Sequence, residues 1–434
     1  MAGSDARPSP AARLRLKRRI RDSGALAAGS VVAGLLAYGF FALTTHSLGA
    51  GGAAPVSILW SYWTAVAAVL TFTLQHWTIR TLAHDGHEGT LARSLPRIAI
   101  MAAVVAALAG LVAYVFREPL FGDPGVVFPA LVAAITVGSV FTGLLRGALA
   151  GRHRYGATAA SLVGENAVRV ILAVAVAMAG GGAEAFGVAL ACGPVIGLVW
   201  VRSLRFAREP GHPPASGNPL ALVSETAGGS LISQVVLTSA PVVLAAAGGA
   251  PDQVTSLFVA LAVWRAPYLV ALGMTPKLTG GLTRLAVNRQ ARPLARLRML
   301  TVAGVVGAVA LAVLVSLTLF QPLLHLAFGD DIGLAEWALA ATGAGTAIAV
   351  GNLVLMLLML ALGRPGQATA AWAVAVAVAA GWLGLSGGLA PTSRVVVAFV
   401  LAEASAFILL LGLSVRMPAG PQPSPHLEPQ LRSS

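Results

Sequence analysis

Residues 144–179 read LLRGALAGRHRYGATAASLVGENAVRVILAVAVAMA, a basic turn that leads into a long apolar segment. The turn region carries Arg146, Arg152 and Arg154, and the apolar segment contains Glu165 and Arg169. An ionisable side chain at the centre of a bilayer costs about 2.5–3.5 kcal/mol on insertion scales. If this segment spans a membrane, its two charged residues therefore need a partner or a function.

Two short motifs near this stretch return in the second half of the chain. The sequence Ala-Thr-Ala-Ala at 157–160 is repeated at 368–371, an offset of 211 residues. Upstream, Phe-Gly-Asp at 121–123 is repeated at 328–330, an offset of 207 residues. Two matches in the same order and at nearly the same offset predict a duplicated unit.

The composition is that of a membrane protein. Hydrophobic residues make up 57% of the chain, charged residues only 10%, and the mean hydropathy is +0.82. These values lie outside the range of soluble globular domains, and only helices or closed barrels span a bilayer. We therefore predict an all-α polytopic membrane protein. Runs of about 20 apolar residues predict twelve spans, at about 24–48, 56–78, 98–116, 126–145, 157–179, 184–201, 220–247, 254–275, 299–320, 335–361, 367–387 and 395–415.

The net charge of +13 is explained by topology. With the amino terminus inside, 25 of the 29 Lys and Arg residues fall in cytoplasmic segments and only Arg117 and Arg394 fall in outer loops. This asymmetry is the positive-inside rule, and it predicts that both termini are cytoplasmic. It also removes the reason to expect a nucleic-acid partner. The two arginines left over, Arg169 and Arg265, lie within predicted spans.

The predicted spans divide the chain into five parts. A basic cytoplasmic tail (1–22) precedes a first lobe of six spans (23–202), and a second lobe of six spans (220–416) precedes a disordered cytoplasmic tail (417–434). The lobes are joined by a proline-rich cytoplasmic linker (203–219), a composition typical of connections between domains.

Glu165 and Arg169 are four residues apart, so they share one face of their helix and are spaced to pair. Two interpretations stay open from the sequence. The pair is an internal ion pair that neutralises both charges, or its face lines a hydrated cavity in which Arg169 offers bidentate donors to a phosphate.

Three further charged residues lie inside predicted spans. Arg265 lies two residues before Pro267, which removes a backbone hydrogen bond and is expected to bend the helix; an arginine beside such a break is expected to line a cavity. Glu225 and Glu403 are the other buried carboxylates. Each is either paired with a structural partner or a protonatable coupling site, with H⁺ or Na⁺ as the coupling ion.

The chain lacks the motifs that energise or catalyse reactions in other membrane proteins. It has no Walker loop, no CxxC and no HExxH pattern, so we expect no ATP-driven pump, no cofactor and no metal site. Enzymatic catalysis by a membrane glycosyltransferase or polymerase is the least favoured interpretation, because the first outer loop has no carboxylate.

Three features together resemble the multidrug/oligosaccharidyl-lipid/polysaccharide (MOP) exporter superfamily. They are the twelve apolar segments in two sets of six, the Pro-Leu and Phe-Gly-Asp motifs within 320–333, and the Leu-Leu-Arg-Gly…Gly-Arg…Arg-Tyr turn of 144–155 before an arginine-bearing span. The resemblance covers about residues 20–416, and within the superfamily it is to bacterial polysaccharide flippases.

The resemblance implies two pseudo-symmetric six-helix bundles around a cavity that opens alternately to either side of the bacterial cytoplasmic membrane. The implied substrate is a lipid-linked (polyprenyl-pyrophosphate) oligosaccharide, whose headgroup Arg169 and Arg265 would bind. It also implies a monomeric transport unit and association with polysaccharide-assembly enzymes. Independently of the resemblance, the arginine-rich segment 276–298, PKLTGGLTRLAVNRQARPLARLR, predicts an amphipathic interfacial helix beside anionic membrane lipids. Lipid II flippases carry cavity arginines on their first two helices and two extra helices, both of which this sequence lacks, so lipid II is disfavoured. A cation-coupled drug antiporter of the same superfamily, with Glu225 as its coupling residue, is the alternative.

Overall fold

The chain forms two bundles of long helices, and the part of it that the structure describes contains no strand. The computed structural model describes the backbone of 10–82, 88–207, 219–273, 282, 285 and 291–415, and the side chains of these except 10–27, 219–227, 273 and 291. The first lobe comprises α1 (Pro10–Val66), the π-helical turn η1 (Ala67–Thr71), α2 (Phe72–Leu82), α3 (Glu88–Val115), α4 (Arg117–Phe121), α5 (Val127–Gly151), α6 (Tyr155–Met178), α7 (Ala183–Ala191) and the 3₁₀ segment η2 (Gly193–Leu204). The second lobe comprises α8 (Pro219–Ala246), α9 (Pro251–Trp264), α10 (Ala266–Gly273), α12 (Ala291–Val315), the π-helical turn η3 (Ser316–Phe320), α13 (Gln321–Phe328), α14 (Glu336–Ala361), α15 (Pro365–Leu385) and α16 (Pro391–Val415).

The helices match the predicted spans. Among the described residues, ten helices are long and apolar enough to cross a bilayer, and the bent pair α9 and α10 makes eleven. The first of the ten runs for 55 residues from Ala28 to Leu82, about 80 Å at 1.5 Å per residue, whereas a bilayer core is about 30 Å thick. It is broken at Gly49, where φ is 68° and ψ is 173°. Dividing it there gives the two separate spans predicted at 24–48 and 56–78.

The ends of the predicted domains differ in detail from the sequence analysis. The backbone of α1 already begins at Pro10, so helix extends into the predicted tail of 1–22. The predicted disordered tail of 417–434 and most of the predicted linker, 208–218, lie outside the described residues.

The internal repeat predicted from sequence has a counterpart in backbone geometry. Between α5 and α6, the Arg154 amide donates to the Leu149 carbonyl, and between α14 and α15 the Arg364 amide donates to the Met359 carbonyl, each at 2.8 or 2.9 Å. The residue before each arginine, His153 or Gly363, has a positive φ (57° and 69°). These turns are therefore equivalent, at an offset of 210 residues, one fewer than the offset of the Ala-Thr-Ala-Ala match.

The same offset relates the contacts of the two turn arginines. Arg154 Nη1 donates to Ser203 Oγ at 3.2 Å, and Arg364 Nη1 donates to the Leu413 carbonyl at 2.8 Å. In each lobe the turn between the fourth and fifth spans is thus tied to the end of the sixth. The duplication extends beyond the short motifs to tertiary contacts.

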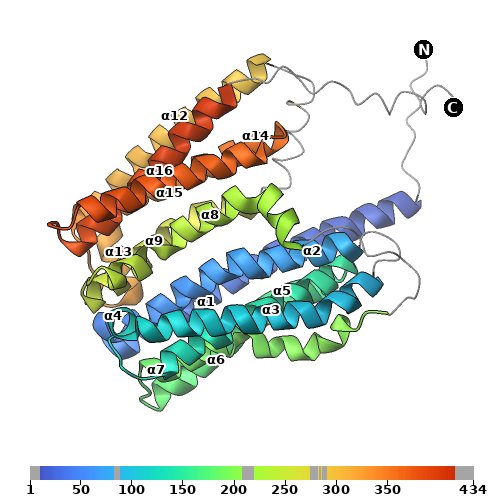
Figure 1. Cartoon of the computed structure of the whole chain (residues 1–434), viewed down its shortest axis with the longest axis horizontal. Helices are drawn as coiled ribbons and strands as arrows, with labels where there is room; N and C mark the ends of the chain where they lie inside the picture. The colour runs from blue at the N-terminus through green and yellow to red at the C-terminus, as the bar shows by residue number, and fades with distance from the viewer. Residues whose placement is uncertain are drawn as a thin grey trace.

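The two lobes lie side by side in Figure 1, one built from α1–α7 and η2 and the other from α8–α16. We call the end of the bundle where α1 begins and α16 ends the terminal end, and the opposite end, where α4 and α13 lie, the loop end. The lobes contact each other mainly through α1, which packs against α8 and α9.

Hydrogen bonds and aromatic rings join the lobes along α1 and α9. Thr255 Oγ1 donates to the Ala50 carbonyl at 2.7 Å near the loop end, and the Tyr38 hydroxyl donates to the Ala262 carbonyl at 2.6 Å. Tyr38 lies about 16 Å along α1 from Gly49, at about the middle of a bilayer-sized span. These bonds join the lobes along their seam from the loop end to mid-depth, and beyond mid-depth α8 also contacts η1 and α2 of the first lobe.

An aromatic cluster fills this seam. The ring of Phe41 lies 4.4 Å from that of Phe258 and 6.5 Å from that of Phe328, centroid to centroid. All three side chains are buried in one apolar core that includes residues of both lobes. Opening the molecule at the loop end therefore requires these rings to separate.

Candidate functional site

Three charged side chains meet inside the first lobe, two from the middle of α6 and one from the last third of α5. Glu165 Oε2 accepts from Arg146 Nη2 of α5, and Glu165 Oε1 accepts from Arg169 Nη2 of α6, both at 2.5 Å. The three residues are 3%, 8% and 1% exposed, in the order Glu165, Arg146, Arg169. We call them the charged triad. It holds two positive charges and one negative charge, so it keeps a net charge of +1 at membrane depth.

Every nitrogen of the Arg169 guanidinium has a partner. Nε donates to the Leu190 carbonyl at 3.0 Å, Nη1 to Asn166 Oδ1 at 3.2 Å and Nη2 to Glu165. The ring of Trp63 covers the guanidinium, with its centroid 4.1 Å from the Arg169 Cζ atom, in the range of a cation–π contact. Of the two interpretations that the sequence left open, this conformation shows the internal ion pair. In this conformation three of the five N–H donors of Arg169 are used by the protein and the residue is 1% exposed, so the headgroup contact stays a prediction.

Arg146 is the member of the triad that the sequence analysis did not single out. It was placed with Arg152 and Arg154 in the basic turn, but it lies inside α5 and also donates from Nε to Ser161 Oγ at 3.3 Å. The apolar residues on both sides of Arg146 are the signal that distinguishes it. Arg152, by contrast, lies at the turn and pairs with Glu88 at 3.0 Å.

Gly193 makes room for the triad. A Cβ atom at this position would lie 2.6 Å from Arg169 Nε and 2.9 Å from Glu165 Cγ. Because the Arg169 side chain is held at all three nitrogens, it has no space into which to move. The absence of a side chain at Gly193 thus permits η2 to pack directly against the ion pair.

We expect Gly193→Ala to destabilise the protein by about 1–3 kcal/mol, the usual cost of overpacking a filled interior. The measurement is the thermal unfolding temperature of the purified protein in detergent. Gly381→Ala is the matched control, because Gly381 lies in α15 with no atom near the site of an added Cβ. Equal unfolding temperatures for the two variants would contradict the close packing at Gly193.

Arg265 lies at the break between α9 and α10, beside the seam between the lobes. The helix bends by 43° between α9, which ends at Trp264, and α10, which begins at Ala266, so the bend predicted from Pro267 is confirmed. The Arg265 Nε is buried and has no hydrogen-bond partner. No hydrogen bond or ion pair joins this side chain to any residue in the described ranges.

The surroundings of Arg265 belong to both lobes. Tyr38 of α1 and Tyr268 of α10 are the ionisable side chains that act on its charge. The Tyr38 hydroxyl is hydrogen-bonded to Ala262, one turn before Arg265. Arg265 is thus a mid-depth cation at the seam between the lobes, and it makes no side-chain hydrogen bond to the residues that the structure describes.

Glu403 is fully buried in the second lobe beside Asn352. Asn352 Nδ2 donates to Glu403 Oε2 at 2.8 Å and to the Glu403 carbonyl at 2.9 Å. Both Glu403 Oε1 and Asn352 Oδ1 are buried without a partner in the described part of the chain. Two unpaired acceptor oxygens on neighbouring residues favour a proton or a cation at this position, because an unsatisfied buried acceptor costs about 1–3 kcal/mol.

A second polar pair lies between Glu403 and the seam. Gln234 Nε2 of α8 donates to the Tyr268 hydroxyl at 2.5 Å, and the charge of Glu403 acts on Tyr268. Tyr268 is therefore near enough to both Glu403 and Arg265 to interact with the charge of each. Sequence reasoning missed this connection, because the residues come from three helices that are distant in the chain.

The two lobes carry side chains of different charge at positions that the internal repeat makes equivalent. At the 210-residue offset, Glu403 of the second lobe corresponds to Gly193 of the first, which packs on the charged triad. The first lobe thus has an excess of positive charge at the depth where the second has a carboxylate. The predicted coupling residue Glu225 lies in α8, but its side chain is outside those that the structure describes. The described residues contain no group of three or more His, Cys, Asp or Glu side chains suited to a metal ion.

Comparisons with known proteins identify the fold. No family model and no curated protein sequence matches the chain. Among solved structures, the chain is similar to a multidrug resistance MATE family transporter of the MOP superfamily in an inward-facing conformation, with a TM-score of 0.61, 16% identity and coverage of 89% of this chain and 96% of that one. An outward-facing conformation of such a transporter gives a TM-score of 0.54 and 16% identity over 92% of this chain and 94% of that one.

A third similar structure is a MOP superfamily transporter from Pyrococcus furiosus, described as having a binding pocket of reversed polarity that suggests a different function. Its TM-score is 0.57 at 15% identity, over 92% of this chain and 94% of that one. The chain therefore has the two-bundle fold of MATE-type transporters, as predicted, and is a multi-pass membrane protein. At these identities the likeness shows the fold alone.

Proposed function

We propose that this protein is an alternating-access exporter that moves an anionic, polyprenyl-pyrophosphate-linked glycan across the bacterial cytoplasmic membrane. The lobes would rock about the seam, and both termini would lie in the cytoplasm, as the distribution of Lys and Arg favours. The 23–202 and 220–416 lobes are the moving units of this proposal. The two lobes contact each other at the loop end. With both termini in the cytoplasm, the loop end faces outward, so this conformation would be closed to the outside.

The observation that carries the proposal is Arg265. Arg265 is half-buried at mid-depth, and its Nε is buried without a hydrogen-bond partner in the described part of the chain. Charged residues at such depth in membrane proteins mark substrate pathways. Arg265 lies at a helix break beside the seam between the lobes, and a substrate that moves between the lobes would pass this point. A guanidinium offers bidentate donors to a pyrophosphate, whereas it would repel a cationic drug.

The charged triad supports the same choice of substrate. Its net charge of +1 makes the interior of the first lobe attractive to anions, although Arg169 is held by Glu165. We propose that Arg169 contributes through this field in the conformation described here, and that a direct contact with the headgroup requires Glu165 to exchange partners. For the Pyrococcus furiosus transporter of this fold, the reversed polarity of the binding pocket is described as suggesting a different function.

A binding experiment tests the proposal. The purified protein is heated in detergent with a polyprenyl pyrophosphate, with the corresponding uncharged polyprenol, or with a lipophilic cation. We expect the pyrophosphate alone to raise the unfolding temperature, because a ligand that binds the folded state stabilises it by mass action. Stabilisation by the cation and not by the pyrophosphate would contradict the proposal.

A cation-coupled antiporter is the second candidate, and Glu403 favours it. A buried carboxylate with a free oxygen beside the free oxygen of Asn352 is suited to bind H⁺ or Na⁺. This candidate does not exclude the first, since export of an anionic lipid also needs a driving force. The two differ in the charge of the substrate.

We expect Glu403→Gln to leave the protein folded and to abolish the dependence of transport on pH or sodium. Glutamine keeps the shape and the hydrogen bond with Asn352 but cannot exchange a proton. The measurement is the transport rate in proteoliposomes across a pH and a sodium series. Glu336→Gln, at the exposed start of α14, is the control, and Glu225→Gln tests the residue first predicted for coupling. An unchanged ion dependence in Glu403→Gln would exclude Glu403 as the coupling site.

A further inference from the structure

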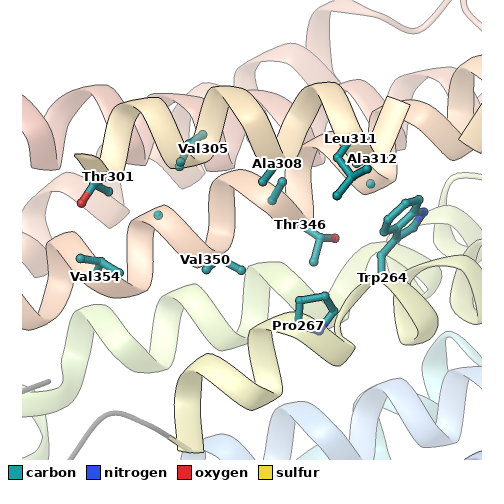
Figure 2. Close-up of a pocket in the computed structure, with 14 residues that line it drawn as sticks. Trp264, Pro267, Thr301, Val305, Ala308, Leu311, Ala312, Thr346, Val350 and Val354 are labelled. Atoms are coloured by element: carbon teal, nitrogen blue, oxygen red, sulfur yellow. The ribbon is translucent and has the colours of Figure 1, made fainter. Parts of the chain in front are cut away.

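The second lobe has an apolar groove on the surface between α12, α14 and the bend of α9 and α10. Its volume is about 400 Å³, and its lining is almost wholly apolar. Figure 2 shows Thr301 and Val354 at one end of the groove and Trp264, Leu311 and Ala312 at the other. From Thr301 to Ala312 the groove extends about 16 Å along α12, close to the thickness of one leaflet of a core of about 30 Å.

The helix that forms one wall of this groove is peripheral. Its large apolar side chains are exposed on several sides, among them Met299 (64%), Val306 (63%) and Leu311 (60%). Such exposure fits a helix surrounded by hydrocarbon. A groove in this surface is therefore open to the acyl chains of the bilayer, and glycines keep it free. An added Cβ atom at Gly304, which lines the groove, meets no atom within 4 Å.

A cation stands at the terminal end of the groove. Arg298 lies one turn before Thr301, and it precedes the lining residue Val305 by seven residues, so both lie on the same face of α12. The Nε and Nη2 atoms of Arg298 are buried without a hydrogen-bond partner in the described part of the chain. Two unused guanidinium donors of this kind match the oxygens of a phosphate.

We propose that this groove and Arg298 form a binding site for an anionic phospholipid, with one acyl chain in the groove and the headgroup phosphate on Arg298. The depth profile agrees with this occupant, because the cation lies at the end of a span and the apolar groove continues from it to mid-depth. The methyl end of the lipid's acyl chain would touch Trp264 and Pro267, which flank the bend at Arg265. The lipid would thus contact the bend between α9 and α10. This site does not depend on the identity of the transported substrate.

Native mass spectrometry of the full-length protein tests the site, in a titration with phosphatidylglycerol and phosphatidylcholine of identical acyl chains. We expect the wild type to retain phosphatidylglycerol about tenfold more tightly, the size of one charge-assisted contact. Arg298→Gln should abolish this preference. Arg296→Gln is the matched control, because Arg296 lies on the same helix, is exposed and has the same charge.

The groove itself is tested by filling it. Gly304→Leu should weaken retention of both lipids, whereas Gly307→Leu should not, because Gly307 has equal free space but does not line the groove. Size-exclusion profiles check that each variant is folded. Equal loss of the preference in Arg296→Gln and Arg298→Gln, or equal retention by the two leucine variants, would overturn the proposal.

Discussion

Replacing Glu165 by alanine is expected to cause the largest loss of stability of any single substitution in this chain. Glu165 accepts from both Arg146 and Arg169 at 2.5 Å, and its removal leaves two buried positive charges without a counter-ion. Breaking a buried ion pair by removing one partner costs about 3–5 kcal/mol. The measurement is the yield of monodisperse protein and its unfolding temperature, and both should fall sharply.

Two further variants show whether the charges are the cause. Glu184→Ala removes a carboxylate from the exposed start of α7, where no ion pair is present in the described structure, and should be neutral. Replacing Arg146, Glu165 and Arg169 together by Met, Leu and Met removes all three charges and should restore stability, because an apolar substitute for a buried ion cluster is often neutral or better. If Glu165→Ala is as stable as Glu184→Ala, the triad does not stabilise the first lobe.

The triple variant also separates structure from transport. If it folds and still transports, the triad is structural only. If it folds and fails to transport, the positive field of the first lobe, or a direct contact of Arg169 with the substrate, is needed for function.

Replacing Arg265 by alanine is expected to cause the largest loss of transport without a loss of folding. Arg265 makes no side-chain hydrogen bond or ion pair within the described chain, so little stabilisation is lost with it, and a half-buried charge at membrane depth is removed. If its guanidinium binds a pyrophosphate, a contact of about 1.5–3 kcal/mol disappears. We expect at least about a tenfold fall in the initial rate of headgroup translocation in proteoliposomes.

Two controls accompany this measurement. Arg265→Lys keeps the charge but not the bidentate fork, and should give an intermediate rate. Arg97→Ala removes an exposed arginine from α3 and should leave the rate unchanged. A rate for Arg265→Ala equal to that of the wild type, at equal protein incorporation, would exclude Arg265 from the substrate pathway.

Features that are local in sequence could be predicted. The helical spacing of Glu165 and Arg169 placed the two residues on one face, within reach of each other, and Pro267 predicted the bend at Arg265. The length of the apolar runs predicted the spans, and the two short repeats predicted the duplication that the turns at His153 and Gly363 display. Each of these depends on residues within a few positions of one another, where helical geometry is nearly fixed.

Contacts between distant segments could not be predicted. Arg146 reaches Glu165 across a turn, Asn352 reaches Glu403 over 51 residues, and Tyr38 reaches Ala262 over 224. A single sequence does not indicate which helix faces which, because bilayer-spanning helices are apolar on nearly all sides. For the same reason the sequence left open whether Arg169 is paired or free.

The break at Gly49 is a further example. Residues 49–55 were predicted as an outer loop, and the structure instead continues as helix on both sides of one residue with a positive φ. A single left-handed glycine is enough to turn a helix, so a loop of several residues is not needed.

The central claim is that Arg265, the mid-depth cation at the seam between the lobes, selects an anionic lipid-linked substrate. The most direct measurement is translocation by the purified wild-type protein in proteoliposomes that contain a fluorescent polyprenyl-pyrophosphate oligosaccharide, in parallel with efflux of a cationic dye. Access of an external reagent to the sugar headgroup reports the first, and loss of internal dye reports the second. We predict protein-dependent movement of the pyrophosphate-linked headgroup, with no change in its covalent bonds, and no dye efflux above that of empty liposomes. Dye efflux by folded protein without movement of the headgroup would contradict the account and identify a cation antiporter.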